Sequence, residues 1–186
     1  MVPLTSLWLP ILLSAVVVFV ASSLIHMVLG YHKSDFAQLP READVMNALR
    51  PFAIPPGEYM VPRPSKMADM KTPEFQDKIN KGPVGVFTVW PNGMMNMGKT
   101  LTMWFVYLLV VSVFAGYVAS HAVAPGAQYL EVFRFTGATA FAAYALALWQ
   151  DSIWYRKSLS TIIKNTFDGL VYALLTAGTF GWLWPM

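Results

Sequence analysis

The stretch FDGLVYALLTAGTFGWLW, residues 167–184, decides the fold of this chain. It is apolar nearly throughout and close to the length of about 20 residues that an α-helix needs to cross a bilayer. A small residue recurs at every fourth position, so these residues share one face of a helix: Gly169, Ala173, Ala177 and Gly181. Within lipid, small residues at this spacing let two helix backbones pack closely. The stretch therefore predicts a membrane-spanning helix that packs against another helix.

The composition of the whole chain is typical of a membrane protein. Of its 186 residues, 56% are hydrophobic and only 12% are charged, whereas soluble domains average about 25% charged residues. The chain has no cysteine, which excludes disulfides, cysteine nucleophiles, iron–sulfur clusters and cysteine-ligated zinc. No Lys or Arg precedes the first apolar run. The basic start of a secretory signal is therefore missing, and we expect the first helix to be retained.

Four apolar segments are long enough to span a membrane, with about 18 to 24 residues each. They cover approximately residues 7–29, 101–124, 132–149 and 162–184. The sequence thus predicts an all-α integral membrane protein that forms a four-transmembrane-helix bundle. We expect the chain to be organised as a first transmembrane helix in 1–30, a loop segment in 31–98, and transmembrane helices 2–4 in 99–186.

The positions of Lys and Arg predict the orientation of the bundle. Nearly all of them lie between the first and second spans or between the third and fourth spans, whereas the remaining connection and both termini contain none. Basic residues near membrane spans stay preferentially on the cytoplasmic side. We therefore expect loops 31–98 and 150–161 in the cytoplasm, both termini outside, and a bacterial inner membrane as the location.

The cytoplasmic segment 31–98 contains most of the chain's 13 prolines, which predicts a mostly irregular structure. Short helices are indicated at about 41–49 and at 72–82, where a threonine cap, a proline at the first helical position and a terminal glycine mark the ends. Residues 84–90 are typical of a strand, with 58–61 as a possible pairing partner. The segment has too little apolar mass for a core of its own, so we expect it to lie against the bundle or a neighbour.

Faces of small residues recur in the second and third spans. They comprise Ser112, Gly116 and Ser120 in the second span, and Thr139, Ala143 and Ala147 in the third. Three of the four spans thus carry a small-residue face, which favours a tight bundle. The first span is bulkier, and we expect it on the periphery or facing a partner.

Charged residues within spans are candidate functional groups because they are costly in lipid. Glu131 and Arg134 are three residues apart and share a helix face. His121 lies about as far before the turn between spans two and three as Glu131 lies after it, so the two residues are expected at a similar depth in the membrane. We expect these three residues to cluster at the outer membrane face. A structural role, in which an ion pair fixes the depth of the helix or Arg134 extends toward the headgroups, is favoured over a functional one.

A second candidate cluster is expected at the inner face. His26 lies near the inner end of the first span, and Asp168 lies about two turns into the fourth. If the two side chains touch, they can exchange a proton near neutral pH. The alternative, which we favour, is an aspartate held near a helix N-terminus by the helix dipole and by Lys164.

The sequence predicts no cofactor and no bound metal. Haem b needs two histidines facing each other at one depth, whereas His26 and His121 lie near opposite faces and His32 lies in the loop. Methionines in 67–70 and 94–97 offer thioethers to Cu(I), although we favour a packing role for them. Haem and copper therefore remain the less favoured alternatives.

No phosphate-binding glycine loop, Ser/His/Asp arrangement, paired-carboxylate site or nucleic-acid surface is present in the sequence. We therefore expect a non-catalytic polytopic membrane protein, a structural or accessory subunit of a larger membrane complex. Its expected partners are membrane lipid and other membrane subunits or copies of itself. The alternative is a small proton- or ion-coupled transporter or channel, as a single chain or a homo-oligomer, whose path is lined by His26, Asp168, Glu131 and Arg134. A redox or copper-handling enzyme component is a third option.

Overall fold

The computed structural model describes all residues from Met1 to Met186. The chain forms two compact units. The first unit, which we call the bundle, comprises residues 1–37 and 96–186, and the second, which we call the insert, comprises residues 38–95. The insert therefore interrupts the bundle between its first and second long helices.

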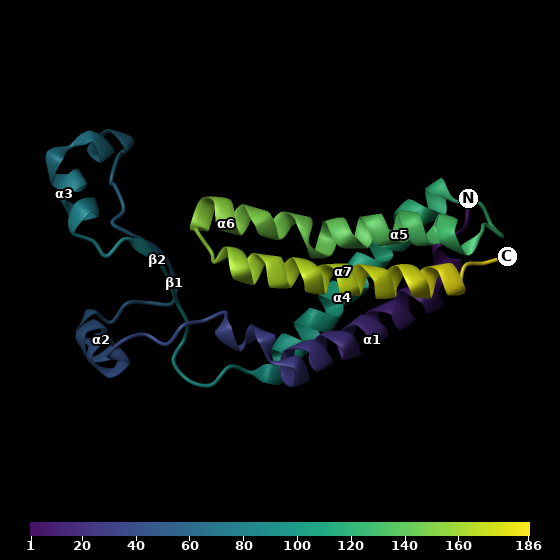
Figure 1. Cartoon of the computed structure of the whole chain (residues 1–186), viewed down its shortest axis with the longest axis horizontal. Helices are drawn as coiled ribbons and strands as arrows, with labels where there is room; N and C mark the ends of the chain where they lie inside the picture. Colours follow the sequence, from purple (N-terminus) through teal and green to yellow (C-terminus); the bar gives the residue numbers. More distant parts are fainter. The chain divides into compact units, whose positions relative to one another are not determined.

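Long helices run side by side in the bundle (Figure 1). They are α1 (Trp8–Leu24), α4 (Met97–Ala122), α5 (Tyr129–Tyr144) and α7 (Leu159–Trp182), with the shorter α6 (Trp149–Tyr155) between the last two. Helix α7 packs against α1 and α5, and α4 packs against the same two helices. Short helical turns extend α1 at both ends, η1 (Leu4–Leu7) and η2 (Ile25–Leu29), and are followed by η3 (Tyr31–Ser34).

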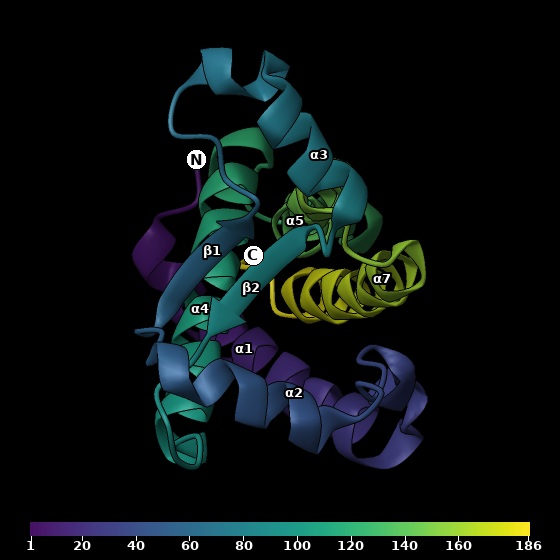
Figure 2. The same cartoon turned by 90° about the vertical axis from the view of Figure 1, so that its left-hand side faces the viewer.

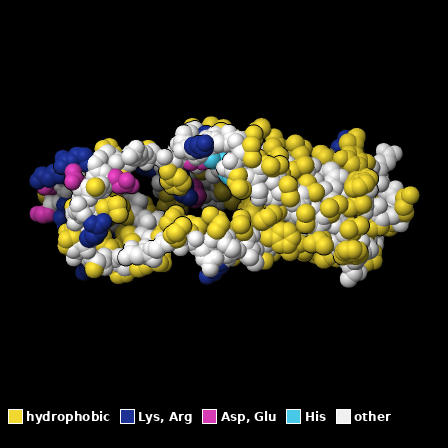
Figure 3. Space-filling view, turned by 90° about the horizontal axis from the view of Figure 1, so that it is seen from below, with side chains coloured by type: hydrophobic (Ala, Val, Ile, Leu, Met, Phe, Trp, Pro, Cys, Tyr) yellow, Lys and Arg dark blue, Asp and Glu magenta, His cyan; other side chains and the backbone are white.

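Three helical segments are long and apolar enough to cross a membrane: Leu4–Leu29, Met97–Ala122 and Tyr129–Tyr155. The face of the bundle seen in Figure 3 is correspondingly covered by hydrophobic side chains. The fourth expected span forms α7. This helix is long enough to cross a membrane, but its mean hydropathy is too low for it to count among the candidate spans. The structure therefore agrees with a helical membrane protein, while the count of four spans stays a prediction.

The small-residue face of α7 lies where its neighbours come closest. A Cβ added to Gly169 would lie 2.9 Å from the Cβ of Ala145, and one added to Gly181 would lie 2.8 Å from the ring of Tyr129. Ala173 and Ala177, which continue this face, are buried. Backbones that approach this closely leave no room for a larger residue, as expected for helices packed through small side chains.

The small-residue face of α4 is also buried. Ser112, Gly116 and Ser120 all lie in the bundle interior. The hydroxyl of Ser14 on α1 donates a hydrogen bond to Ser112 Oγ at 3.0 Å, and a Cβ on Gly116 would lie 3.1 Å from the ring of Phe180. This face therefore contacts both α1 and α7.

The packing face expected for the third span, and the peripheral position expected for the first, are wrong. Ala143 and Ala147 are exposed and Thr139 is only half-buried, whereas the buried residues of α5 follow a stride of four one position away: Val132, Thr136, Ala140 and Tyr144. The face that α5 turns toward the bundle is thus not decided by small residues alone, because the larger Val132, Thr136 and Tyr144 are buried on it. Helix α1 is not peripheral either, since Ser14, Ala15, Val18 and Ser22 are buried against the other helices.

The expected loop 150–161 is largely helical. Helix α5 ends at Tyr144, a short turn η6 (Leu146–Leu148) follows, and α6 continues to Tyr155. The connection to α7 is therefore confined to 156–158, with Arg156 in a left-handed conformation at φ 54°. No glycine or proline occurs between 138 and 158, so the break after α5 has no marker in the sequence.

The insert contains the elements that its sequence indicates. Helices α2 (Glu42–Leu49) and α3 (Pro73–Lys81) flank an antiparallel pair of strands, β1 (Gly57–Val61) and β2 (Gly85–Val89), which lie side by side in Figure 2. Short turns occur at Arg50–Phe52 and Met67–Lys71. The expected cap is confirmed, because Thr72 Oγ1 accepts a hydrogen bond from the Phe75 backbone N–H at 3.3 Å. Phe75 is the one side chain of the insert that is buried.

Candidate functional site

The polar end of the bundle is formed where the chain leaves α1. The helical turn after α1 ends at Gly30, whose φ of 67° is a left-handed conformation that suits glycine. This turn directs the following segment, residues 31–35, against α7. As a result, Tyr31 and His32 contact Asp168, which is far away in the sequence and only 3% exposed.

Asp168 is held by two side chains of the 31–35 segment. The Tyr31 hydroxyl donates a hydrogen bond to Asp168 Oδ1. His32 Nε2 lies 2.7 Å from Asp168 Oδ2, and His32 Nδ1 lies 2.6 Å from Asp35 Oδ2. The His32 imidazole is therefore placed between two carboxylates.

Lys164, one helical turn before Asp168, completes the contact between α7 and this segment. Its Nζ donates hydrogen bonds of 2.8 Å each to the Tyr31 carbonyl, Ser34 Oγ and Asp35 Oδ1. The expected proximity of Lys164 and Asp168 on one helix is real, but the ammonium group pairs with Asp35 rather than with Asp168. Asp168 instead depends on Tyr31 and His32.

Each close contact between an imidazole nitrogen and a carboxylate oxygen needs a proton between the two atoms. His32 makes two such contacts, with Asp35 and with Asp168. The ring is therefore either a doubly protonated imidazolium, or it carries one proton while a second proton resides on one of the carboxylates. This arrangement can hold or release a proton in the interior of the bundle's polar end.

Two groups of the segment outside the apolar spans have displaced pKa values. Burial disfavours the ionised form of Asp35, but the hydrogen bonds from Lys164 and His32 outweigh it and lower the pKa of Asp35 below its usual value. Burial, together with the hydrogen bond to Asp168, raises the pKa of Tyr31 above its usual value. Tyr31 is therefore held as a neutral donor and Asp35 as a carboxylate.

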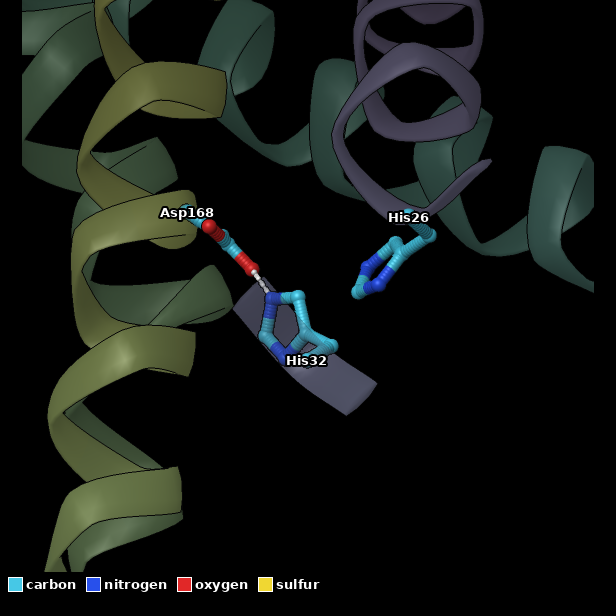
Figure 4. Close-up of side chains that lie close together, drawn as sticks. All are labelled: His26, His32 and Asp168. Carbon is cyan, nitrogen blue, oxygen red and sulfur yellow. Dashed lines mark hydrogen bonds and ion pairs between the residues drawn. The ribbon is translucent and has the colours of Figure 1, made fainter. Parts of the chain in front are cut away.

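His26 lies beside this cluster without a hydrogen bond to it. Its side chain extends from the end of α1 toward His32 and Asp168 (Figure 4), and the two imidazole ring centres are 4.4 Å apart. The contact considered between His26 and Asp168 is not made; His32 Nε2 takes that place, 2.7 Å from Asp168 Oδ2. One ligand atom from each of His26, His32 and Asp168 lies within 4.8 Å of the others, so these residues can hold a metal ion.

A pocket of about 540 Å³ opens next to the cluster. His26 and Asp168 line it together with aromatic side chains from α4, α5 and α7, including Trp104, Tyr144 and Tyr172. The hydroxyl groups of Tyr144 and Tyr172 are buried and have no hydrogen-bond partner in the protein. A buried hydroxyl without a partner is unfavourable. The two tyrosine side chains line the pocket, while their hydroxyl oxygens have almost no exposed surface.

The cluster expected at the outer face is not assembled. His121 is exposed, and its Nδ1 lies 2.9 Å from the Tyr117 carbonyl of its own helix. Glu131 and Arg134 are exposed, and neither takes part in an ion pair. The two ends of the bundle therefore differ: one contains a connected polar network and the other contains separate surface groups.

Sequence reasoning missed His32, Tyr31 and Asp35 because it assigned them to the loop. A signal was present, since a deeply placed aspartate needs hydrogen-bond donors, and YHKSD follows the first span directly. The haem argument also separated His32 from His26, whereas their rings are neighbours. The methionines considered for copper are exposed, as Met67, Met70, Met94 and Met97 illustrate.

No protein-family model, curated protein or solved structure matches this chain. The function of the chain must therefore be inferred from its own side chains and surfaces.

Proposed function

We propose that the protein is a polytopic membrane protein that acts as an accessory subunit of a larger membrane assembly. In this proposal the bundle resides in a bacterial inner membrane with both termini outside, and the insert contacts partner subunits in the cytoplasm. The ends of the chain lie together at one end of the bundle (Figure 1), where the Val2 N–H donates to the Ser120 carbonyl and the Gly126 N–H donates to the Pro185 carbonyl. Basic residues such as Lys157 lie toward the other end, which agrees with this orientation.

The observation that carries the proposal is the surface of the insert. Apart from Phe75, its large hydrophobic side chains are not buried. Many exposed large apolar side chains within one short segment are typical of interaction surfaces. The most exposed of them are Phe52, Met67, Trp90 and Met94.

The test is purification from the native membrane in mild detergent. We expect other proteins to copurify in a fixed ratio to this chain. Trp90→Glu places a charge on the exposed apolar surface, and we expect it to remove those partners without changing the melting temperature. Thr88→Glu adds the same charge at a polar exposed position nearby and is the matched control. A single monodisperse species from wild-type membranes would contradict the proposal.

Proton- or ion-coupled transport is a second candidate, favoured by one observation. The Asp168 carboxylate is buried at one end of the bundle and lies 2.7 Å from His32 Nε2; buried ionisable groups within membrane proteins often mark proton or ion paths. The separate positions of His121, Glu131 and Arg134 give no second site at the other end. Transport therefore has weaker support than the accessory role.

Reconstitution into vesicles tests the transport candidate. If the protein conducts protons, an imposed pH gradient should collapse faster in vesicles that contain it, and Asp168→Asn should abolish the effect. Asp151→Asn alters a more exposed aspartate that pairs with Lys157 and should leave the flux unchanged. Equal flux in Asp168→Asn and wild type would remove Asp168 from any transport path.

A further inference from the structure

We propose that His26, His32 and Asp168 form a binding site for a divalent first-row transition-metal ion. Two imidazoles and one carboxylate are a common ligand set for Zn²⁺ and Fe²⁺. The candidate ligand atoms lie within 4.8 Å of one another, whereas metal–ligand bonds of about 2.1 Å place tetrahedral ligand atoms roughly 3.4 Å apart. His32 Nε2 and Asp168 Oδ2, which are 2.7 Å apart, must therefore separate by roughly 0.7 Å, and the His26 ring must approach them by up to about 1.4 Å. This inference goes beyond the accessory role and does not depend on it.

His26 is the ligand that can supply this movement. Its side chain is exposed and makes no hydrogen bond, and its ring already lies beside that of His32 (Figure 4). A rotation of this side chain breaks no interaction within the cluster. The exposed position of His26 also gives the ion a route into the site.

His32 and Asp168 are already oriented as metal ligands. Asp35 lies 2.6 Å from His32 Nδ1, which leaves Nε2 directed at Asp168. A carboxylate that holds the distal nitrogen of a histidine is the usual outer partner of a metal-bound imidazole. A metal ion would replace the proton between His32 Nε2 and Asp168 Oδ2, and the Tyr31 hydroxyl would continue to hold the other oxygen of Asp168.

The charge around the site favours a cation. Once the proton between His32 Nε2 and Asp168 Oδ2 has left for solvent, the histidines are neutral, Asp35 and Asp168 contribute two negative charges, and Lys164 contributes one positive charge. The Lys164 ammonium is directed at Asp35, Ser34 Oγ and the Tyr31 carbonyl. It therefore does not occupy the space between His26, His32 and Asp168, and the net charge of this cluster is negative.

The pocket provides the remaining coordination position. His26 and Asp168 line the pocket of about 540 Å³, and His32 lies between them. An ion bound there would lie beside the pocket that the side chains of Trp104, Tyr144 and Tyr172 help to line. Sites with three protein ligands and an open position bind a water or a small oxygen-donor molecule as the fourth ligand. The geometry thus matches an open metal site rather than a closed structural one.

Titration of the purified full-length protein with Zn²⁺, after treatment with a chelator, tests the proposal. We expect one Zn²⁺ per chain and a rise in melting temperature on binding. Substitution with Co²⁺ should give the visible absorption bands of a four-coordinate ion with nitrogen and oxygen ligands. Binding no stronger than that of detergent micelles without protein would overturn the site.

The variants separate metal binding from folding. His26→Ala should abolish stoichiometric binding while leaving the metal-free melting temperature unchanged, because His26 makes no hydrogen bond. Asp35→Asn should weaken binding by about 10–100-fold, as loss of an outer partner does. His121→Ala removes a histidine at the other end of the bundle and should bind as wild type does. Unchanged Zn²⁺ affinity in His26→Ala would overturn the proposal.

Discussion

The bundle and the insert bury their apolar residues to very different extents. In the bundle, buried side chains from α1, α4, α5 and α7 form two clusters, and even the polar residues Asp168 and Thr136 have hydrogen-bond partners. In the insert, Phe75 alone is buried and the ion pairs are exposed. The same chain therefore contains a region with a buried core, which also encloses hydrogen-bonded polar side chains, and a region that is stabilised by local turns, caps and a short strand pair.

Because of this difference, substitutions in the two regions should change stability by different amounts. Buried polar groups are costly when they lose a partner, whereas exposed hydrogen bonds exchange readily with water. We therefore expect large effects in the bundle and small, local effects in the insert.

The largest effect is expected from Asp168→Ala. The change removes the acceptor for both Tyr31 and His32 and should reduce the free energy of unfolding by about 3–5 kcal/mol. Unfolding in mixed detergent micelles measures this value. Asp69→Ala is the comparison in the insert, where an exposed carboxylate accepts a hydrogen bond from the Lys66 backbone N–H at 2.8 Å; a loss of only about 1 kcal/mol is expected. Equal losses would remove the distinction between the regions.

A smaller effect is expected from Gly169→Ala. The new methyl group would lie 2.9 Å from the Ala145 Cβ and 3.3 Å from the Tyr144 carbonyl carbon, so the helices must separate at a cost of about 1–3 kcal/mol. The same thermal or denaturant unfolding measures it. Gly178→Ala on the same helix meets nothing closer than 3.4 Å and should be neutral or stabilising by up to about 1 kcal/mol. In the insert, Gly85 has nothing within 4 Å, so its alanine variant should cause no clash.

Acidification should weaken the bundle through Asp35. Because the pKa of Asp35 is lower in the folded protein than its usual value of 3.8, its contribution to stability is fully present above that value and is lost as the pH falls through the folded pKa. Melting temperatures measured from pH 6 down to pH 2.5 should therefore decline below about pH 4. Asp35→Asn should be less stable at pH 6 and should decline less steeply. Parallel curves for the two proteins would contradict the assigned role of Asp35.

The smallest effect is expected from Thr72→Ala. Loss of the hydrogen bond to the Phe75 N–H should destabilise α3 by about 1 kcal/mol. Hydrogen exchange should accelerate in residues 73–81, while the melting temperature of the bundle stays unchanged. Faster exchange throughout α7 would indicate that the two units unfold together, and the comparison would then fail.

The sequence predicted the elements better than it predicted their contacts. Local signals were sufficient for α3, with its threonine cap and terminal glycine, and for the pairing of 57–61 with 85–89. The rotation of α5 was missed because both Ala140 and Ala143 are small, and only the packing of larger neighbours selects between them. Helix α6 was missed because no residue type marks the break at Ala145.

The candidate site was predicted in part. His26 and Asp168 were identified because polar residues in apolar helices are unusual, and both line the pocket. His32 and Asp35 were missed because their burial depends on the turn at Gly30, which brings a loop segment against α7. His121 lies near the C-terminus of α4, and Glu131 and Arg134 lie near the N-terminus of α5. They gain nothing by meeting, since water or headgroups can solvate them.

The contact between Tyr31 and Asp168 joins residues 137 positions apart, which has a consequence for biogenesis. During synthesis, the first helix enters the membrane long before the last helix leaves the ribosome. Until then, Tyr31, His32 and Asp35 have no Asp168 or Lys164 to bind, and water or the insertion machinery must solvate them. Closure of this end is therefore one of the last steps in assembly, and a ribosome stalled before residue 164 would leave it open.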